Sequence, residues 1–497
     1  MQTVSENKIR ILSNILLHCQ QQEQGRLRSF IALTQVNREF FTNGTLAIQE
    51  VLEIGNPRDL RRYVDRVRRA RETKWGDGSC LDELDAETMR DAVRDVTLGE
   101  RWGSRYDADS FGNRFDPRKV IDFLSSHKNL QSLSIFRTTF PVSQLFDILS
   151  QLPELKRVQV KWFKERNDIF FRYNESDVPV ILPDIETVYL AELGKPWVHQ
   201  HGVLEATAGL MTTPSVAHLH LEWETFHDVF HDIWPGIQRG TLEYERPESL
   251  QSFTLGKSSG RSLQPGSSMA NRVGGYIMLF LEHAAEDLQE LSLQCDFELK
   301  IPDVYSTLPF PELKSFSGPV PLLIRLRIGR HLREVELLGP ITMVSQFYRM
   351  PWRRCLRVLR MRYYDYEGFD AEPYAQIANA CPGVTHIFFA TSGCSLGASG
   401  MRRLWTVISQ FPNLEVLELR GAYPFNPPFF GDGYQSIFVP EEDPATVVPE
   451  LFSTHPSLRV LSVQSTLKWV RGASGWEMYE ITDKNSRITT SDDLEDM

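Results

Sequence analysis

One spacing of apolar residues, apolar-x-x-apolar-x-apolar, recurs along most of the chain. It is clearest at Leu414, Leu417 and Leu419, within the segment 411–419. The other copies are Leu130/Leu133/Ile135, Leu155/Val158/Val160, Ile185/Val188/Leu190, Val216/Leu219/Leu221, Leu250/Phe253/Leu255, Leu288/Leu291/Leu293, Leu332/Val335/Leu337, Leu356/Leu359/Met361, Val384/Ile387/Phe389 and Leu458/Leu461/Val463, with a shortened copy at Leu313/Phe316. Successive copies mostly start about 19 to 38 residues apart, so the pattern predicts a repeat array of irregular period.

The last positions of each copy alternate between inward and outward side chains, as in a strand with one buried face. A helix is predicted ahead of many copies. In 141–152 the apolar residues share one helical face, and Pro153 then ends the run. The segments 274–285, 401–411 and 447–452 have the same character. The predicted unit is therefore a helix, a stop and a strand.

A single unit of this kind cannot bury its own apolar face, so neighbouring units must stack, with a parallel ribbon of strands and the helices outside. The ladder resembles that of the leucine-rich repeat family, specifically its long, irregular, helix-containing members, although the Asn that usually follows the strand is not kept. The resemblance implies an α/β solenoid with its strands on the concave side. We assign residues 116–470 to this solenoid, 46–115 to a linking strand, helix and irregular loop, 1–45 to a short helical module and 471–497 to a polar, acidic tail.

The N-terminal module is predicted to contain two amphipathic helices. It resembles an F-box, whose pattern opens with apolar-Pro-x-Glu-Ile-Leu-x-x-Ile and closes on Val-x-Arg-x-Phe. The matching residues are Ile15, Leu16 and Cys19 in the opening and Val36, Arg38 and Phe40 in the closing part, while Leu12 stands where the family has Pro and Asn14 where it has Glu.

The F-box resemblance implies binding of a Skp-type adaptor and, through it, of a cullin ubiquitin ligase. The adaptor-binding residues that it implies are Ile11, Leu12, Ile15, Leu16, Cys19, Leu27, Val36, Arg38 and Phe40. The alternative is that residues 1–45 form a cap over the open end of the array.

Between this module and the regular array, residues 46–54 are predicted to form a strand and 57–74 a helix with Pro57 near its start. Leu60, Tyr63, Val64 and Val67 are expected to pack inward. The many arginines of this helix are either a solvated outer face, which we favour, or a basic stripe for RNA or an acidic partner. Residues 75–115 are expected to be an irregular loop with one helix near 85–96.

Two insertions interrupt the array. The segment 257–271 is rich in Ser and Gly, and 421–449 holds several aromatic residues and prolines. The aromatic segment is either a binding element or a cap for the end of the solenoid, and the two interpretations have equal support. The last residues, 491–497, are acidic and are expected to be disordered.

Composition narrows the classes of function. The chain has 497 residues, 41% hydrophobic and 24% charged, and its net charge of -11 argues against non-specific nucleic-acid binding. Its six cysteines, Cys19, Cys80, Cys295, Cys355, Cys381 and Cys394, form no CxxC pair and follow no secretory signal, which predicts reduced thiols in an intracellular protein of the cytoplasm or nucleus. No apolar run reaches the roughly 18 residues that a membrane span requires.

One motif suggests catalysis. Gly393-Cys394-Ser395-Leu396-Gly397 fits the nucleophile-elbow pattern G-x-S-x-G, and Asp432 or Asp443 with His455 follows in hydrolase order. Because strand, turn and helix follow one another in every repeat, we favour an ordinary turn.

The pair His218 and His220 lies on the outward side of a strand without further ligands, so no metal or cofactor site is predicted.

Outward side chains of the ribbon form the predicted partner-binding surface. They are Arg157, Lys161, Tyr189, His218, His220, Glu334, Glu336, Arg360, Arg362 and Phe388. This mixture of basic, aromatic and acidic groups suits a specific protein partner better than a uniform polyanion. We therefore predict a non-enzymatic adaptor whose repeats hold a substrate protein while the F-box-like module docks to the ligase. The alternatives are a repeat scaffold without ligase coupling and a serine hydrolase acting through Ser395.

Overall fold

A computed structural model describes residues 51–72, 90–99, 117–136, 149, 151–161, 184–191, 201–238, 249–256, 268–282, 284–295, 309–339, 341, 343–364, 372–392, 397–422, 455–463, 467–473 and 475–480. Within it the chain forms two compact units, Met1–Ser249 (unit 1) and Leu250–Met497 (unit 2). The adaptor-binding residues assigned to the F-box-like module all lie outside the described residues.

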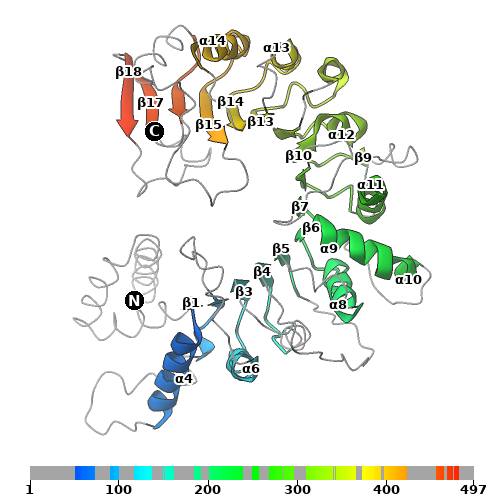
Figure 1. The fold of residues 1–497 in the computed structure, drawn as a ribbon, viewed down its shortest axis with the longest axis vertical. Coiled ribbons are helices and arrows are strands. Elements are labelled where there is room, and N and C mark those ends of the chain that lie inside the picture. Colours follow the sequence, from blue (N-terminus) through cyan, green and yellow to red (C-terminus); the bar gives the residue numbers. More distant parts are fainter. Residues whose placement is uncertain are drawn as a thin grey trace, which may run out of the picture. The chain divides into compact units, whose positions relative to one another are not determined.

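Unit 1 is a parallel ribbon of strands with helices on one side of it (Figure 1). Its described elements are β1 (Val51–Ile54), α4 (Pro57–Glu72), β2 (Asp95–Leu98), α6 (Pro117–Ser125), β3 (Ser132–Phe136), β4 (Arg157–Lys161), β5 (Thr187–Ala191), α8 (His201–Met211), β6 (His218–Glu222), α9 (Trp223–Asp228), the π-helical turn η3 (Val229–Ile233) and α10 (Trp234–Gln238). Each strand from β1 to β6 pairs in parallel with the next.

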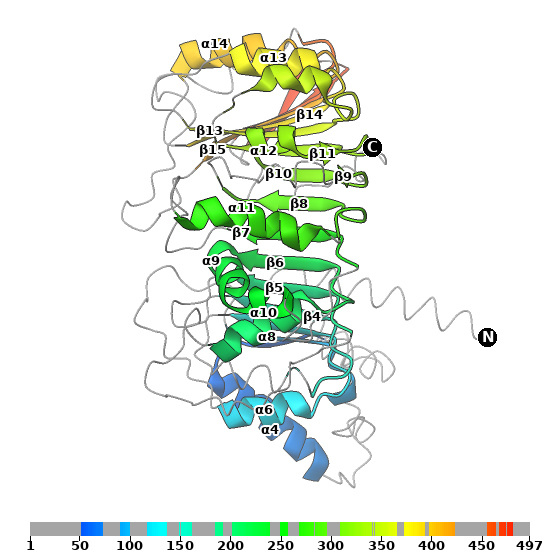
Figure 2. The same cartoon turned by 90° about the vertical axis from the view of Figure 1, so that its right-hand side faces the viewer.

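Unit 2 repeats this arrangement, and Figure 2 shows its strands lying one above another as rungs. Its described elements are β7 (Ser252–Gly256), α11 (Ser268–Leu281), β8 (Glu290–Leu293), β9 (Pro309–Phe310), β10 (Ser315–Pro319), α12 (Val320–Arg325), β11 (Arg327–Ile328), β12 (Glu334–Leu338), the 3-10 helix η5 (Val344–Arg349), β13 (Val358–Tyr364), α13 (Glu372–Ala380), β14 (His386–Ser392), α14 (Gly397–Ile408), β15 (Val416–Ala422), β16 (Val460–Val463), β17 (Leu467–Gly472) and β18 (Gly475–Glu480).

The main ribbon of unit 2 is parallel from β7 to β16. An antiparallel hairpin, β17 and β18, then closes it. The short strands β9 and β11 pair separately.

The apolar ladder forms the core of each unit, which confirms the leucine-rich repeat solenoid. In unit 1, Leu133 and Ile135 pair in register with Val158 and Val160, and all four are buried. In unit 2, Leu359 and Ile387 occupy neighbouring rungs and are fully buried. Burial of such side chains is the main stabilising term in a fold whose repeats contact only their neighbours.

The shortened copy in β10 has a steric explanation. Gly318 occupies its last ladder position, and a Cβ atom there would lie 2.9 Å from Cζ of Phe316. The Phe316 ring therefore fills the space that the third apolar residue occupies in other repeats.

The residue three positions before the first ladder residue closes the turn into each strand, and it is buried in most described repeats. Leu152, Thr213, Cys381 and Phe411 are examples. Histidine takes this place twice, as His127 and His455, and both are buried.

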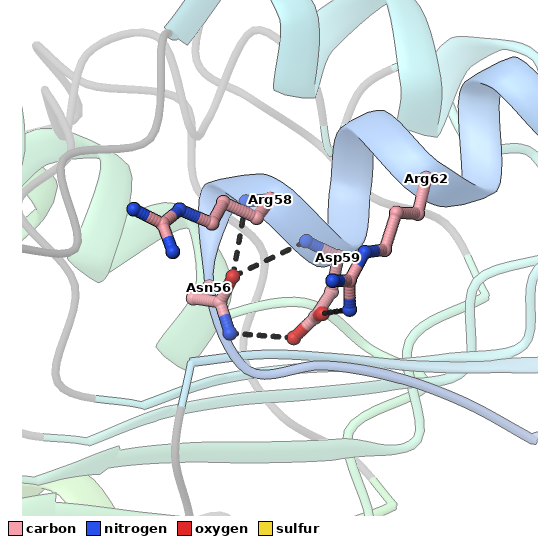
Figure 3. A network of polar contacts seen from close by, with 4 residues as sticks. All are labelled: Asn56, Arg58, Asp59 and Arg62. Carbon is pink, nitrogen blue, oxygen red and sulfur yellow. Dashed lines mark hydrogen bonds and ion pairs between the residues drawn. The ribbon is translucent and has the colours of Figure 1, made fainter.

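Helix α4 begins at Pro57, as predicted, because its first turn is capped (Figure 3). The Oδ1 atom of Asn56 accepts hydrogen bonds from the backbone N–H groups of Arg58 and Asp59, at 3.0 and 3.2 Å. The side-chain amide of Asn56 donates to Oδ2 of Asp59 at 2.6 Å. Pro57 has no backbone N–H, but the first residue of a helix needs none because its N–H would have no acceptor within the helix.

Three sequence expectations were wrong. Val64 of α4 does not pack inward but is 44% exposed, whereas Leu60, Tyr63 and Val67 are buried. The helix predicted near 85–96 does not extend to residue 96: Arg90 and Asp91 are helical, but β2 begins at Asp95 and pairs with both β1 and β3. The residues from 471 onward are not simply a tail, because β17 and β18 extend the sheet to Glu480.

Candidate partner-binding face

The side chains that alternate with the buried ladder form what we call the open face of each unit. In unit 2 it has two rows that stay in register from β7 to β16. The first row is Ser252, Glu290, Ser315, Glu334, Val358, His386, Val416 and Val460. The second row is Thr254, Ser292, Ser317, Glu336, Arg360, Phe388, Glu418 and Ser462.

Arg360 is held in place at the middle of this face. Its Nη1 atom donates to Oε2 of Glu334 on the neighbouring strand at 2.8 Å. Its guanidinium carbon lies 5.0 Å from the ring centroid of Phe388 on the other neighbouring strand. The side chains of Arg360 and Glu334 remain 39% and 42% exposed. An arginine fixed between a carboxylate and an aromatic ring still presents donors to a partner.

Serine hydroxyls position two further carboxylates of the face. Ser317 donates to Oε2 of Glu336 at 2.7 Å, and Ser252 donates to Oε2 of Glu290 at 2.9 Å. Each pair joins neighbouring strands, so these acidic side chains are oriented by the ribbon and not only by their own rotamers.

His386 lies in the first row, between Val358 and Val416. Burial lowers its pKa below the usual value. The carboxylates of Glu415 and Glu334 oppose that shift, and Arg360 reinforces it. Its Nδ1 atom lies 2.9 Å from Oγ1 of Thr385. Near neutral pH this imidazole is therefore uncharged, and the charge of the face comes from its carboxylates and arginine.

In unit 1 the open face is more basic and aromatic. Tyr189 and His220 lie side by side on β5 and β6 with ring centroids 4.1 Å apart and planes 19° apart. Arg157 and His218 lie in the adjoining row, and both are exposed. Leu219 is buried between the two histidines, as the repeat pattern predicts.

All ten residues predicted for partner binding lie on strands. Glu334, Glu336, Arg360 and Phe388 come together on β12, β13 and β14. Arg157, Lys161, Tyr189, His218 and His220 belong to unit 1, on β4 to β6. Arg362 lies two residues beyond Arg360 on β13. Whether these residues bind a partner stays a proposal.

Sequence reasoning omitted several residues of this face, among them Ser317, His386 and Glu418. The alternation that located Arg360 and Phe388 applies equally to them. The alternation in the sequence therefore identifies these residues too, although they were not included in the predicted set.

The structure removes the base from the hydrolase hypothesis. Ser395 itself lies outside the described residues, and Gly397 already begins α14. His455 is buried, and its Nε2 atom lies 3.1 Å from the carbonyl oxygen of Phe411, to which it donates. Its Nδ1 atom accepts the backbone N–H of Leu458 at 3.2 Å. Both ring nitrogens serve the turn, so neither is available to a serine.

The part of the chain that the structure describes contains no group of three or more His, Cys, Asp or Glu residues arranged to hold a metal ion. Cys295, Cys355 and Cys381 are free thiols. None of the described helices has both the length and the apolar character needed to cross a bilayer.

Comparison with known proteins finds likeness only in structure. No family model and no curated protein matches the sequence. The yeast Rad7–Elc1 complex has a TM-score of 0.37 at 11% identity, over 76% of each chain. The leucine-rich repeat-containing protein LegL7 from Legionella pneumophila has a TM-score of 0.30 at 12% identity, over 64% of this chain and 90% of that one. The TLR13–ssRNA13 complex has a TM-score of 0.29 at 12% identity, over 77% of this chain and 52% of that one. Because these scores are low, the assignment of the leucine-rich repeat fold rests on the strand register and helix order of this chain itself.

Proposed function

We propose that this protein is a non-enzymatic scaffold that holds a partner protein on the open face of its repeats. The observation that carries the proposal is Arg360, fixed between Glu334 and Phe388 within rows of polar side chains that stay in register. Arginine and aromatic residues dominate the energetically important centres of protein interfaces. A side chain that is already oriented loses less entropy when a partner binds.

The fold itself needs little from this arrangement. An ion pair as exposed as Arg360 and Glu334 contributes only about 0 to 1 kcal/mol to stability. Its ordered geometry is therefore better explained by recognition than by stability.

We further propose that residues 1–45 couple the scaffold to a Skp-type adaptor of a cullin ubiquitin ligase inside the cell. This step is supported by the F-box resemblance of Ile15, Leu16, Cys19, Val36, Arg38 and Phe40. If it is correct, the protein bound on the open face is the substrate that the ligase modifies.

A pull-down with purified Skp-type adaptor tests the coupling. The full chain is compared with a chain lacking residues 1–45 and with a Leu16→Asp, Val36→Asp double variant. We expect binding to the intact chain and loss in both variants, while circular dichroism shows that the repeats remain folded. No binding by the intact chain would leave a scaffold without ligase coupling.

Quantitative affinity capture tests the open face separately. Arg360→Glu and Phe388→Ala are compared with Arg272→Glu, which changes an exposed residue of α11 away from the face. We expect at least one protein to be captured by the native chain and by Arg272→Glu but lost from both face variants. Equal capture by all four chains would exclude this face as the binding site.

A further inference from the structure

A row of basic side chains lies along the edge of unit 2 where its strands begin. Lys314, Arg333 and Arg357 immediately precede β10, β12 and β13, and all three are exposed. The backbone N–H of Arg333 donates to the carbonyl of Lys314 at 2.8 Å, and that of Arg357 to the carbonyl of Arg333 at 2.8 Å. The three residues therefore occupy consecutive rungs, about 4.8 Å apart.

Two further arginines lie in the same turns. Arg330 and Arg354 stand three residues before Arg333 and Arg357, and both are exposed. We call Lys314, Arg330, Arg333, Arg354 and Arg357 the basic rim. In the turns 309–314, 329–333 and 351–357, the sequence contains a single carboxylate, that of Glu312.

The charge of the rim is not neutralised within the described residues. Lys314 donates to Oε1 of Gln289 at 2.8 Å, and Arg357 donates to the carbonyl of Gly383 at 2.7 Å, so both have uncharged partners. Arg330, Arg333 and Arg354 make no ion pair or side-chain hydrogen bond with any described residue. Their donors are available to a ligand.

The equivalent row of unit 1 pairs opposite charges. There, Lys156 and Glu186 precede β4 and β5 on consecutive rungs, and their side chains form an ion pair at 2.8 Å. Like charges on neighbouring strands are destabilising, whereas opposite charges are favourable. The rim keeps an unfavourable repulsion that a single substitution would relieve, which is typical of a functional site.

We propose that the basic rim binds a short acidic segment of a partner protein. Arginine side chains match carboxylates with two parallel hydrogen bonds, and three of these four arginines have no competing partner. The rim spans three rungs, about 10 Å, which an extended segment of about three to four residues covers.

The residues on either side of the rim favour a short acidic segment over a nucleic acid. The turn before β8 carries exposed Glu286 and Asp287, and the turn before β15 carries exposed Glu415. A long polyanion that followed the ribbon edge would meet these carboxylates beyond the rim. A segment with a few acidic residues fits between them.

Gly383 shapes one end of the rim. A Cβ atom at this position would lie 2.5 Å from Nη1 of Arg357 and 2.8 Å from the carbonyl oxygen of Arg354. The missing side chain lets the Arg357 guanidinium lie against the next turn, where it is already oriented before a ligand arrives. The rim lies outside the two rows of the open face, so this inference does not depend on the proposed function.

Fluorescence anisotropy with a labelled Asp/Glu-rich peptide and the full chain tests the inference. The variant Arg333→Glu, Arg357→Glu reverses two charges of the rim. Arg272→Glu, Arg459→Glu reverses two exposed charges of the same unit outside the rim and leaves the same net charge. We expect affinity to fall roughly tenfold or more in the rim variant, equivalent to about 1.4 kcal/mol, and less than about twofold in the control.

Three further measurements make the result decisive. Thermal melts show whether both variants fold, and Arg330→Glu, Arg354→Glu replaces the first variant if it does not. A peptide with Asn and Gln in place of Asp and Glu is expected not to bind. Raising the salt from about 0.1 to 0.5 M is expected to weaken binding, because exposed charges are screened.

Several results would overturn the proposal. They are absence of binding to the native chain, equal loss in the rim and control variants, and tighter binding of a single-stranded RNA oligonucleotide than of the peptide. Binding that appears only when residues 481–497 are removed would also overturn it, because the chain's own acidic tail would then be the occupant.

Discussion

At the scale of single residues, two buried histidines in the turns before β3 and β16 make the stability of the protein depend on pH. His127 is buried with its Nδ1 donating to the carbonyl of Phe123 at 2.7 Å and its Nε2 accepting from the hydroxyl of Tyr63 at 3.0 Å. Burial lowers its pKa from 6.5 to about 4, and burial also lowers the pKa of His455 in the equivalent turn. Both imidazoles are neutral in the folded protein at neutral pH.

We predict that mild acid destabilises unit 1 through His127. Its folded-state pKa lies below its unfolded value, so the unfolded chain binds the proton first. The stability present above about pH 6.5 is lost as the pH falls toward 4. At pH 5 the loss from this residue is about 2 kcal/mol. Urea unfolding followed by circular dichroism at pH 7 and pH 5 measures it.

The variant His127→Gln tests the cause. It should be less stable than the native chain at pH 7 but should lose less stability between pH 7 and pH 5. The exposed His331→Gln is the control and should keep the native pH dependence. The same loss in all three chains would assign the effect to other groups.

A second prediction concerns the reactivity of cysteines. Burial raises the pKa of Cys381 to about 12, and Cys295 is also buried, whereas Cys355 is partly exposed. Because the thiolate is the reactive form, iodoacetamide at about pH 8 should label Cys355 roughly tenfold or more faster than Cys381. Peptide mass spectrometry gives the rates. Comparable labelling of all three cysteines in folded protein would contradict the burial of Cys295 and Cys381.

At the scale of elements, the hairpin β17–β18 protects the end of the apolar ladder. Trp469 pairs with Leu461 and is only 2% exposed. Arg471 ties the hairpin to the preceding turn by donating to the carbonyl of His455 at 2.6 Å. The outer edge of β16 is thereby paired with a strand of opposite direction, and the buried Trp469 extends the core beyond the last parallel strand.

We predict that Trp469→Ala lowers the free energy of unfolding of unit 2 by about 3 to 5 kcal/mol, because it leaves a large cavity beside the ladder. Met478→Ala changes an exposed residue of the same hairpin, 53% accessible, and should stay within about 0.5 kcal/mol of the native chain. Chemical denaturation measures both. Similar effects of the two substitutions would show that the hairpin does not cap the core.

The elements that sequence reasoning predicted share a strong local pattern. Leu417 and Leu419 can be placed on a strand because their spacing together with Leu414 fits no helix, and period two then assigns Glu418 to the open face. Strand β2 was missed although Val93, Val96 and Leu98 have the ladder spacing. Residues 85–96 also fit a helical pattern, which holds at Arg90 and Asp91, and pairing with β1 and β3 makes the chain a strand from Asp95.

The C-terminal hairpin and the rim depend on tertiary structure. Arg471 and Glu477 make the chain after 470 look like a polar tail, and only the need to cover Leu461 explains the burial of Trp469. The sequence contains no run of basic residues that would identify the rim, because Lys314, Arg333 and Arg357 are far apart along the chain. Strand register alone places them on consecutive rungs.

At the scale of the whole molecule, the net charge and the basic rim have opposite effects on the binding of anions. The net charge is -11, while the basic rim is confined to three turns. Repulsion by the acidic chain acts on any polyanion, whereas the rim acts only at short range under physiological salt.

We predict that the full chain does not shift a mixed-sequence DNA duplex in a gel-mobility assay at about 0.15 M salt, with a Kd weaker than about 10⁻⁴ M. Charge reversal at Arg333 and Arg357 should leave that result unchanged. A shift at low micromolar protein would contradict the argument from net charge.

The parallel register has a further consequence for how distance is set along each unit. The number of residues between equivalent rungs more than doubles from β10–β12 to β15–β16, yet each pair of strands remains hydrogen-bonded in the same register. The spacing between paired strands is therefore independent of the number of residues that connect them. An insertion between two strands adds residues outside the ribbon and leaves the strand spacing unchanged. A ligand that contacts several strands at once can therefore keep all of its contacts while the connecting segments vary.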